Sequence, residues 1–371
     1  MDDQELINSH IKKINEISVE LDGQKTFMEI CGGHTNIILK YGIKESLPEN
    51  IRLISGPGCP VCVSAQYDID CIIELASKGI PVATYGDMMR VPGSHSSLSD
   101  IKAKGGKVFE VYSATELTEI EKKNPGLVFF GLGFETTAPM SAYLLQNGIT
   151  VYSVHKLVPP AITSLLEGGV QIDGFLNPGH VSTIIGTKAY KHINFPQVIS
   201  GFTPERILRA LSILVELVSN NNTIVVNGYP EAVSEDGNLN AQKILADFFQ
   251  IEDSLWRGLG KLPKSGLEVR DDELNAKKRY EDILSKVPTP EKTACRCGEI
   301  LKGSIEPTDC PLYKKSCTPE NPQGACMVSA EGSCAIAFQF GLCYEQPKTR
   351  AFNPRMKTVA HSAVRHKNLG R

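Results

Sequence analysis

Short apolar runs alternate with amphipathic stretches over the first 226 residues. Residues 5–21 carry isoleucine and leucine at helical spacing, which predicts an opening helix. The stretches 65–78, 114–123 and 204–218 suit further helices. Nine runs suit strands: 26–30, 51–54, 80–85, 108–112, 127–130, 149–154, 172–176, 196–199 and 223–226. Strands that alternate with helices are typical of parallel α/β layers.

Nine strands are more than one small sheet needs, so the sequence favours two similar parallel-sheet α/β domains around a cleft. The Asn124-Pro125-Gly126 turn suits a boundary and gives domains at 22–125 and 126–226. After residue 227 the pattern becomes irregular, and we expect residues 1–21 and 227–345 to form a smaller third domain. Residues 346–371 contain no acidic residue and are most simply a solvated basic tail.

Composition and charge argue against a nucleic-acid-binding, membrane or secreted protein. The chain has 371 residues, with 39 Lys and Arg against 42 Asp and Glu, for a net charge of −3. This balance gives no general attraction to nucleic acid or to an anionic membrane. No apolar stretch approaches the length of a membrane span, and the acidic start does not resemble a secretory signal. We therefore expect a cytoplasmic protein, with neither nucleic acid nor a membrane as partner.

The cysteines are unevenly placed. Of 11 cysteines, four lie between residues 31 and 71, seven lie between residues 295 and 343, and none lies between these groups. A secreted disulfide scaffold would spread its cysteines through a shorter chain. In a reducing compartment, such grouping indicates metal binding or redox chemistry.

The segment 56–62 reads Gly-Pro-Gly-Cys-Pro-Val-Cys and follows a predicted strand. A Cys-x-x-Cys pair at a helix start places two sulfurs within bridging distance, and the helix N-terminus lowers the pKa of one thiol. Cys59 and Cys62 are therefore expected to cycle between dithiol and disulfide or to hold a soft metal. Half of a zinc site is the alternative. The chain has no second Cys-x-x-Cys, so redox or catalytic use is favoured.

Cys31 precedes two glycines and lies close to His34. Open space beside a sulfur suits a nucleophile or a metal ligand. A single cysteine is more often a buried apolar residue, which the glycine pair and the histidine make less favoured here. Cys71, in the middle of the predicted helix 65–78, fits core packing.

Polar residues also follow later predicted strands. The segment 131–137 reads Gly-Leu-Gly-Phe-Glu-Thr-Thr, and Thr136 stands where a dinucleotide fingerprint needs its third glycine, so nicotinamide binding is discounted. Glu135 and Thr136 fit hydrogen bonding or a proton relay, and a helix cap explains them equally well. His180 fits a strand exit or a surface loop. Carboxyl ends of parallel strands face a common crevice, so we expect such loops to meet at a cleft.

Seven cysteines crowd the C-terminal part, namely Cys295, Cys297, Cys310, Cys317, Cys326, Cys334 and Cys343. Four thiolates satisfy a [4Fe–4S] cluster or a four-cysteine zinc site. The spacing matches neither zinc-ribbon pairs nor the bacterial ferredoxin run. Seven cysteines also exceed four ligands, so some have another role.

Several motifs, in order along nearly the whole chain, resemble the HypD family of hydrogenase maturation proteins, which acts in building the active site of nickel–iron hydrogenases. They are residues 31–35 with 40–42, 56–63, 86–93, 129–137, 178–182, 256–260, 297–298, 310–312 and 327–332. This chain departs from the family pattern at Asn36 and Ser55, where many relatives have His, and at Thr203, where Glu is expected.

The resemblance implies two α/β domains around a cleft and a third, iron–sulfur domain. It further implies a scaffold that works with HypC, on which an iron atom receives two cyanides and one carbon monoxide, the cyanide coming from a C-terminal thiocyanate on HypE. Carried onto this sequence, Cys31 holds that iron, and Cys59 with Cys62 is the redox pair. This role is that of a maturation factor with redox activity rather than of a conventional turnover enzyme.

The resemblance also implies a [4Fe–4S] cluster held by Cys297, Cys310, Cys317 and Cys334, with Cys326 or Cys295 as substitutes. The basic tail has no counterpart in the family. Two other functions stay open on the residues alone. One is a stand-alone thiol–disulfide oxidoreductase, and the other is a zinc-stabilised binding protein.

Overall fold

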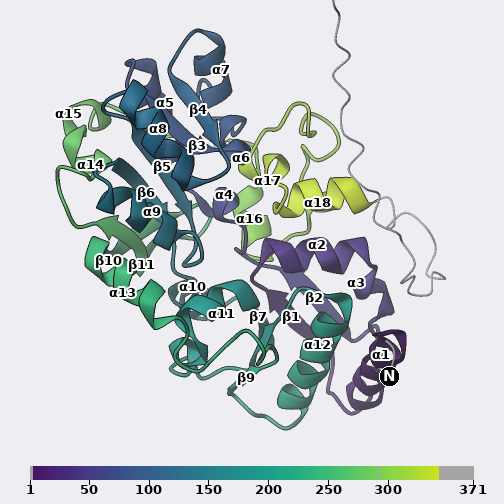
Figure 1. The fold of residues 1–371 in the computed structure, drawn as a ribbon. Helices are drawn as coiled ribbons and strands as arrows, with labels where there is room; N and C mark the ends of the chain where they lie inside the picture. Colours follow the sequence, from purple (N-terminus) through teal and green to yellow (C-terminus); the bar gives the residue numbers. More distant parts are fainter. Residues whose placement is uncertain (1–2, 292, 342–371) are drawn as a thin grey trace, which may run out of the picture.

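The computed structural model describes residues 3–291 and 293–341 (Figure 1). All nine predicted strands are present, and they form two parallel sheets. The fold is therefore α/β with two parallel-sheet units and a smaller irregular part, as the sequence predicted. Cys343 and the predicted basic tail 346–371 lie outside the described residues.

The first sheet, sheet A, has five strands in the order β2-β1-β7-β8-β9. Their bounds are β1 Lys25–Glu29, β2 Ile51–Ser55, β7 Gly174–Pro178, β8 Gln197–Ser200 and β9 Val225–Asn227. The helices of this unit are α1 Asp3–Ser18, α2 Gly32–Lys40, α3 Ile43–Ser46, α11 Gly179–Ile185 and α12 Pro204–Ser219, with the 3-10 helix η2 Thr187–Tyr190.

The second sheet, sheet C, has four strands in the order β4-β3-β5-β6. Their bounds are β3 Val82–Tyr85, β4 Val108–Val111, β5 Val128–Gly133 and β6 Thr150–His155. The helices between residues 60 and 167 are α4 Pro60–Val63, α5 Gln66–Ser77, α6 Gly86–Met89, α7 Leu98–Ala103, α8 Leu117–Lys123, α9 Ala138–Gln146 and α10 Val158–Glu167, with η1 Ala114–Glu116. Strands β5 and β6 are buried along their whole length, because helices cover both faces of a parallel sheet.

The strands do not pair according to a boundary near residue 125. The chain begins sheet A with β1 and β2, crosses to sheet C for β3 to β6, and returns to sheet A for β7 to β9. Strand β7 joins sheet A beside β1, where Met28 pairs with Phe175. The two units are thus interleaved along the sequence, and the chain passes between the two sheets twice before residue 227. Repeated β/α units look alike in sequence, and nothing local states which strand is a neighbour in space.

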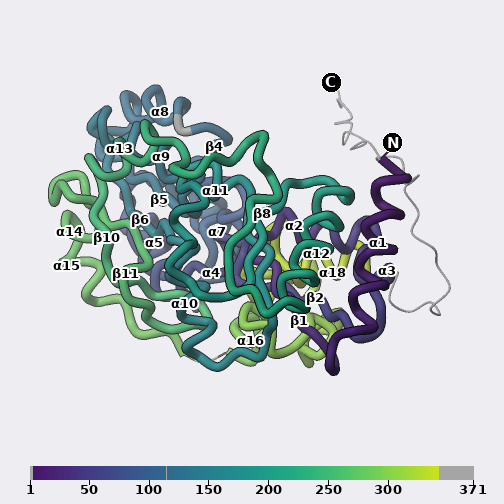
Figure 2. The backbone as a smooth tube through the Cα atoms, turned by 90° about the horizontal axis from the view of Figure 1, so that it is seen from below, coloured from purple at the N-terminus to yellow at the C-terminus, as the bar shows by residue number. Residues whose placement is uncertain are grey.

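The N-terminal helix also differs from the expectation that residues 1–21 belong to the third domain. Helix α1 packs against α12, and its buried Ile7 and Ile14 join the core of sheet A. Figure 2 shows α1 and α12 together at one end of the molecule. An amphipathic helix packs wherever an apolar face is available, and α12 offers one with eight buried residues.

Residues 239–284, which the sequence left irregular, flank sheet C. They form α13 Leu239–Phe248, the antiparallel hairpin β10 Phe249–Trp256 with β11 Gly260–Val269, and the short helices α14 Ala276–Arg279 and α15 Glu281–Leu284. Strand β11 packs against β6, and Leu267 and Val269 enter the core of sheet C. Strand β10 is buried mainly at its two ends and therefore lacks the alternation that would have predicted it.

The cysteine-rich end lies over both units. It contains α16 Cys297–Leu301, η3 Pro307–Asp309, α17 Ala325–Val328 and α18 Ser333–Phe340. Helices α16 and α17 pack against α4, and α18 packs against α2 (Figure 1). The C-terminal part therefore covers the loops that follow β1 and β2. None of the helices described is both long and apolar enough to cross a membrane.

Candidate functional site

Cys31 and the Cys59–Cys62 pair lie beside each other because they follow neighbouring strands. Strands β1 and β2 are parallel, with Glu29 opposite Ser55, so both chains leave the sheet at the same edge. Two backbone hydrogen bonds join the loops, Gly56 N to Glu29 O at 2.8 Å and Gly32 N to Gly58 O at 3.2 Å. The loops that carry the three sulfurs are therefore fixed by the ends of sheet A.

Gly58 makes the closest approach between these loops. A Cβ atom at this residue would lie 2.2 Å from Cys31 N and 2.4 Å from Cys31 Cα. Such distances are well inside van der Waals contact, so only glycine fits here. The Gly-Pro-Gly turn thus seats the Cys-x-x-Cys segment directly against the backbone of Cys31.

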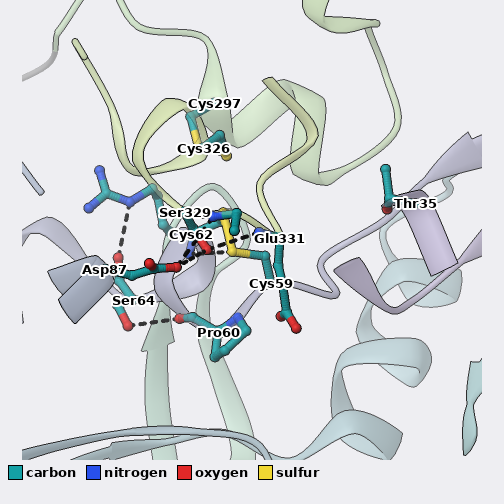
Figure 3. Close-up of a disulfide and its surroundings, with 12 residues drawn as sticks. Thr35, Cys59, Pro60, Cys62, Ser64, Asp87, Cys297, Cys326, Ser329 and Glu331 are labelled. Carbon is teal, nitrogen blue, oxygen red and sulfur yellow. Dashed lines mark hydrogen bonds between the residues drawn. A yellow bond between two sulfur atoms is a disulfide. The ribbon is translucent and has the colours of Figure 1, made fainter. Parts of the chain in front are cut away.

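Cys59 and Cys62 form a disulfide across α4, with their Cα atoms 5.2 Å apart. Cys59 is the N-cap of α4, and its Sγ accepts a hydrogen bond from Cys62 N at 3.2 Å. Both residues are buried, with exposed fractions of 4% and 0%. Helix α4 packs against α16 and α17 of the cysteine-rich end. Figure 3 shows Cys297 and Cys326 to one side of the Cys59–Cys62 disulfide.

Cys31 is the N-cap of α2 and is partly exposed. Burial raises the pKa of its thiol to about 12, and the neighbouring carboxyl groups of Glu331 and Glu29 act in the same direction. Backbone groups of His34 and Gly33 at the start of α2 oppose this rise. Without a bound cation, the residue is therefore a thiol at neutral pH. A metal ion would displace this proton, because a coordinating thiol is deprotonated.

Glu29 is a residue of this site that the sequence did not single out. It is 1% exposed, its Oε2 accepts from Cys31 N at 2.9 Å, and its Oε1 accepts from Thr35 Oγ1. Burial raises its pKa to about 7, despite these hydrogen bonds. The available signal was an acidic residue inside an apolar strand run, two residues before a cysteine. We call Glu29, Cys31, His34, Thr35, Cys59 and Cys62 the strand-end site.

His34 is buried in an aromatic stack. Its Nε2 donates to Gly201 O at 3.1 Å, and its Nδ1 is buried with no hydrogen-bond partner in the described part of the chain. Its ring centroid lies 4.8 Å from that of Phe202, which stacks in turn on His180 at 3.7 Å. Burial lowers the pKa of His34 to about 4, so the ring is neutral. His180 is exposed, which leaves it the more accessible imidazole.

Glu135 and Thr136 follow β5 of sheet C. Glu135 is 2% exposed, and its Oε1 accepts from Val158 N at 3.0 Å, in the first turn of α10. Its Oε2 is buried with no partner among the described residues, and burial raises its pKa to about 7. Thr136 is partly exposed in the same turn. Neither residue belongs to the hydrogen-bonded group around Cys31.

The pKa of Tyr190 responds to the charges of both Glu135 and Cys31. Its phenol is fully buried and shares a hydrogen bond with Ser182 Oγ at 3.1 Å. Burial raises its pKa, and the negative charges of Glu135 and Cys31 raise it further.

The segment after α17 closes the strand-end site on its other side. A Cβ atom on Gly32 would lie 2.5 Å from both the Cβ and the carbonyl oxygen of Glu331. Asp87, at the start of α6, accepts from Ser329 Oγ at 2.9 Å and from Ala330 N at 3.3 Å (Figure 3). Burial raises the pKa of Glu331, and Asp87 adds to this. Glu331 was not predicted, although its motif was noted.

Six cysteines line one small cavity in the C-terminal part. They are Cys295, Cys297, Cys310, Cys317, Cys326 and Cys334, which we call the six-cysteine pocket. Sγ of Cys297 lies 2.6 Å from Sγ of Cys326. Burial and the surrounding cysteines raise the pKa of the Cys334 thiol. The four predicted ligands are thus together, but Cys295 and Cys326 lie with them.

The pocket and the disulfide are neighbours. Helix α16 begins at Cys297 and α17 contains Cys326, and both helices pack against α4. Cys59, Cys62 and the buried cysteines of the pocket belong to one continuous core. Cys71 lies in this core as well, on α5, and is fully buried as its helical context predicted.

Comparison with known proteins points to one family. The family model described as "HypD: Hydrogenase formation hypA family" matches residues 5–341. The chain is 42% identical over 362 residues to "Hydrogenase maturation factor HypD2" of Bradyrhizobium diazoefficiens, covering 90% of this chain and 95% of that protein. It is 42% identical over 355 residues to the HypD of Cupriavidus necator, covering 89% and 93%. It is 39% identical over 356 residues to the HypD of Escherichia coli, covering 91% and 94%.

Proposed function

Because this chain belongs to the HypD family of hydrogenase formation proteins, we propose that it is the scaffold on which the iron of nickel–iron hydrogenases receives its cyanide and carbon monoxide ligands. One observation carries this proposal. The Cys31 loop is hydrogen-bonded to the loop that carries Cys59 and Cys62. Helix α4, which begins at this pair, packs against the helices of the six-cysteine pocket, so the three groups of sulfurs are neighbours in space. A single thiol, a two-electron pair and a metal-binding pocket are what such an assembly needs.

Cys31 is the proposed ligand of the iron substrate. It is the partly exposed sulfur of the strand-end site, and a soft thiolate suits low-valent iron with strong-field ligands. Binding releases the Cys31 proton, and Glu29, one hydrogen bond from the Cys31 backbone, has a pKa of about 7 that suits a proton acceptor. Glu135 and Thr136 are proposed as polar groups that approach from the other sheet.

Cys59 and Cys62 are the proposed source of electrons for cyanide delivery. The carbon of a thiocyanate is electrophilic, whereas a metal-bound cyanide is an anion, so its transfer from HypE requires two electrons. In the balanced step, the S–C bond of the thiocyanate breaks and the Cys59–Cys62 bond forms. Starting from one thiol and one thiolate, the single thiol proton goes to the departing HypE thiolate, and the cyanide leaves as an anion. In the proposed cycle, the disulfide form of the pair is the state after delivery.

The six-cysteine pocket fits a [4Fe–4S] cluster by its donor set, because six thiols face one cavity. Among the described residues, no three Cys, His, Asp or Glu side chains converge to hold one metal ion. A four-cysteine zinc site would draw on the same donor set, and metal and labile-sulfide analysis distinguishes the two. Cys297, Cys310, Cys317 and Cys334 are the proposed ligands, with Cys326 or Cys295 as substitutes. When bound, such a cluster supplies electrons one at a time.

HypC is the proposed stable partner and HypE the transient cyanide donor. The free thiols and the reducible pair suit a cytoplasmic setting, where cysteines stay reduced. The protein would then act as a maturation factor with redox activity, since its product stays bound until it is handed on.

Infrared spectroscopy of the anaerobically purified complex with HypC tests this proposal. We expect cyanide and carbon monoxide bands from the natural sequence and at least a tenfold weaker signal from Cys31→Ala, which removes the proposed ligand. Cys71→Ala is the matched control, because it removes a buried cysteine that lies outside the strand-end site and the six-cysteine pocket. Absence of both bands after co-expression with the complete set of maturation proteins would overturn the proposal.

A stand-alone thiol–disulfide oxidoreductase is the second candidate, and the Cys59–Cys62 disulfide is the observation that favours it. Such an enzyme would reduce a protein disulfide without HypC. The burial of both sulfurs weighs against it, because a protein disulfide has to reach the attacking thiol. Turnover of a model disulfide substrate by the isolated chain would favour this second function.

A further inference from the structure

Arg257 follows strand β10 and lies against the C-terminal end of α4. It follows Trp256, which is 2% exposed and pairs with Ser64 in an antiparallel bridge. Arg257 N donates to Val63 O at 2.8 Å, and its Nε donates to Ser64 O at 3.0 Å. Its Nη1 donates to Gln66 Oε1 at 3.0 Å. The side chain is therefore held against the residues that immediately follow Cys62.

The same segment touches the six-cysteine pocket. A Cβ atom on Gly258, whose φ is +80°, would lie 2.3 Å from Gly298 Cα, and Gly298 follows Cys297. Arg257, Cys295 and Cys297 line one large cavity next to the pocket.

No carboxylate is hydrogen-bonded to the Arg257 guanidinium among the described residues. Its side-chain partners named above are neutral oxygens. Its Nη2 is buried and has no hydrogen-bond partner within the described residues. Because no carboxylate neutralises the positive charge of Arg257, this charge can stabilise a nearby thiolate.

We propose that Arg257 is a positioning residue for the redox step, which holds α4 against α16 and stabilises the reduced Cys59–Cys62 pair by its positive charge. Reduction by a dithiol breaks the Cys59–Cys62 bond, oxidises the dithiol to its disulfide and transfers two electrons. With one proton taken up, the pair becomes one thiol and one thiolate, and the added negative charge is what the cation favours. This inference rests on the proposed function, in which the pair must be reduced again after each delivery.

A redox titration tests the role. The full chain, with its natural cofactor content, is equilibrated anaerobically with reduced and oxidised dithiothreitol. The disulfide fraction is then read by alkylation and mass spectrometry of the peptide that carries Cys59 and Cys62. We expect Arg257→Gln to lower the equilibrium constant for reduction about tenfold, or about 30 mV for a two-electron couple. Arg257→Lys keeps the charge and should stay within about threefold of the natural sequence.

Arg90→Gln is the matched control. Arg90 lines the same cavity, but its Nη2 donates to Pro319 O at 2.6 Å, away from α4, so the equilibrium constant should not change. Circular dichroism checks folding, and Arg257→Met, which keeps the apolar stem, replaces the glutamine variant if that variant does not fold. An unchanged constant in the charge-free variant overturns the proposal, and so does an equal drop in Arg257→Lys. The titration reads a protein disulfide, so its result stands even if the diatomic ligands or the cluster are not found.

Discussion

The strand-end site and the six-cysteine pocket are sulfur centres that the fold holds in different ways. The strand-end site is fixed by the paired ends of β1 and β2, by backbone hydrogen bonds and by the contact of Gly58 with Cys31. The pocket is built from helices of four to eight residues, with η3 and turns between residues 302 and 324. The first site is therefore formed by the sheet before any metal binds, whereas the second has little regular structure to hold its six thiols apart. Bound metal would supply that missing stability, because metal–thiolate bonds contribute folding energy.

Removal of bound metal should affect the two regions most unequally. We expect a chelator with a mild oxidant to raise amide hydrogen exchange in residues 293–341 at least about tenfold, because local opening is governed by the contacts that remain. Peptides from β1 and β2 should keep their protection. Exchange followed by mass spectrometry measures both regions in one sample. Equal protection of the pocket before and after metal removal would show that packing alone orders it. The two sulfur centres would then not differ in their dependence on metal.

Gly58→Ala tests how firmly the sheet holds the strand-end site. The added methyl group overlaps the backbone of Cys31, so we expect a loss of about 3 kcal/mol or more in the free energy of unfolding, the upper range for overpacking. Urea unfolding followed by circular dichroism measures it. Gly341→Ala is the control and should change stability little, because among the described residues a Cβ atom there would meet only Tyr313 Oη, at 3.7 Å. A fully stable Gly58→Ala protein would mean that the two loops are free to separate.

Glu135→Gln tests the buried carboxyl that follows β5 of sheet C. Its pKa is raised from the ordinary 4.5 to about 7, so the folded protein holds this proton more tightly than the unfolded chain does. Its contribution is therefore complete below about pH 4.5 and falls as the pH rises to about 7, by about 2 to 3 kcal/mol. The glutamine keeps the bond to Val158 N and cannot ionise. Its unfolding free energy should fall less between pH 5 and 8 than that of the natural sequence, and parallel pH profiles would contradict this assignment.

Part of the fold and of the site could be predicted locally. The nine strands were predicted by their apolar runs, α5 and α12 by helical spacing, and the disulfide by the Cys-x-x-Cys spacing. Four C-terminal cysteines were predicted to lie together as cluster ligands, and they line one pocket with Cys295 and Cys326. The hairpin β10–β11 was missed, since β10 is exposed along most of its length and has no alternating pattern.

What the amino-acid sequence determined by itself is the set of elements and reactive groups, because spacing and residue type act over a few positions. The tertiary structure alone decided their neighbours. It placed β7 beside β1, returned the chain to sheet A after four strands of sheet C, and packed α1 on α12. It also brought Glu331 and Arg257 to the cysteine-bearing segments, from a turn and from the end of a hairpin strand. Pairing among similar strands depends on the burial of whole faces, and the field around a thiol depends on residues hundreds of positions away, so neither is written in any local pattern.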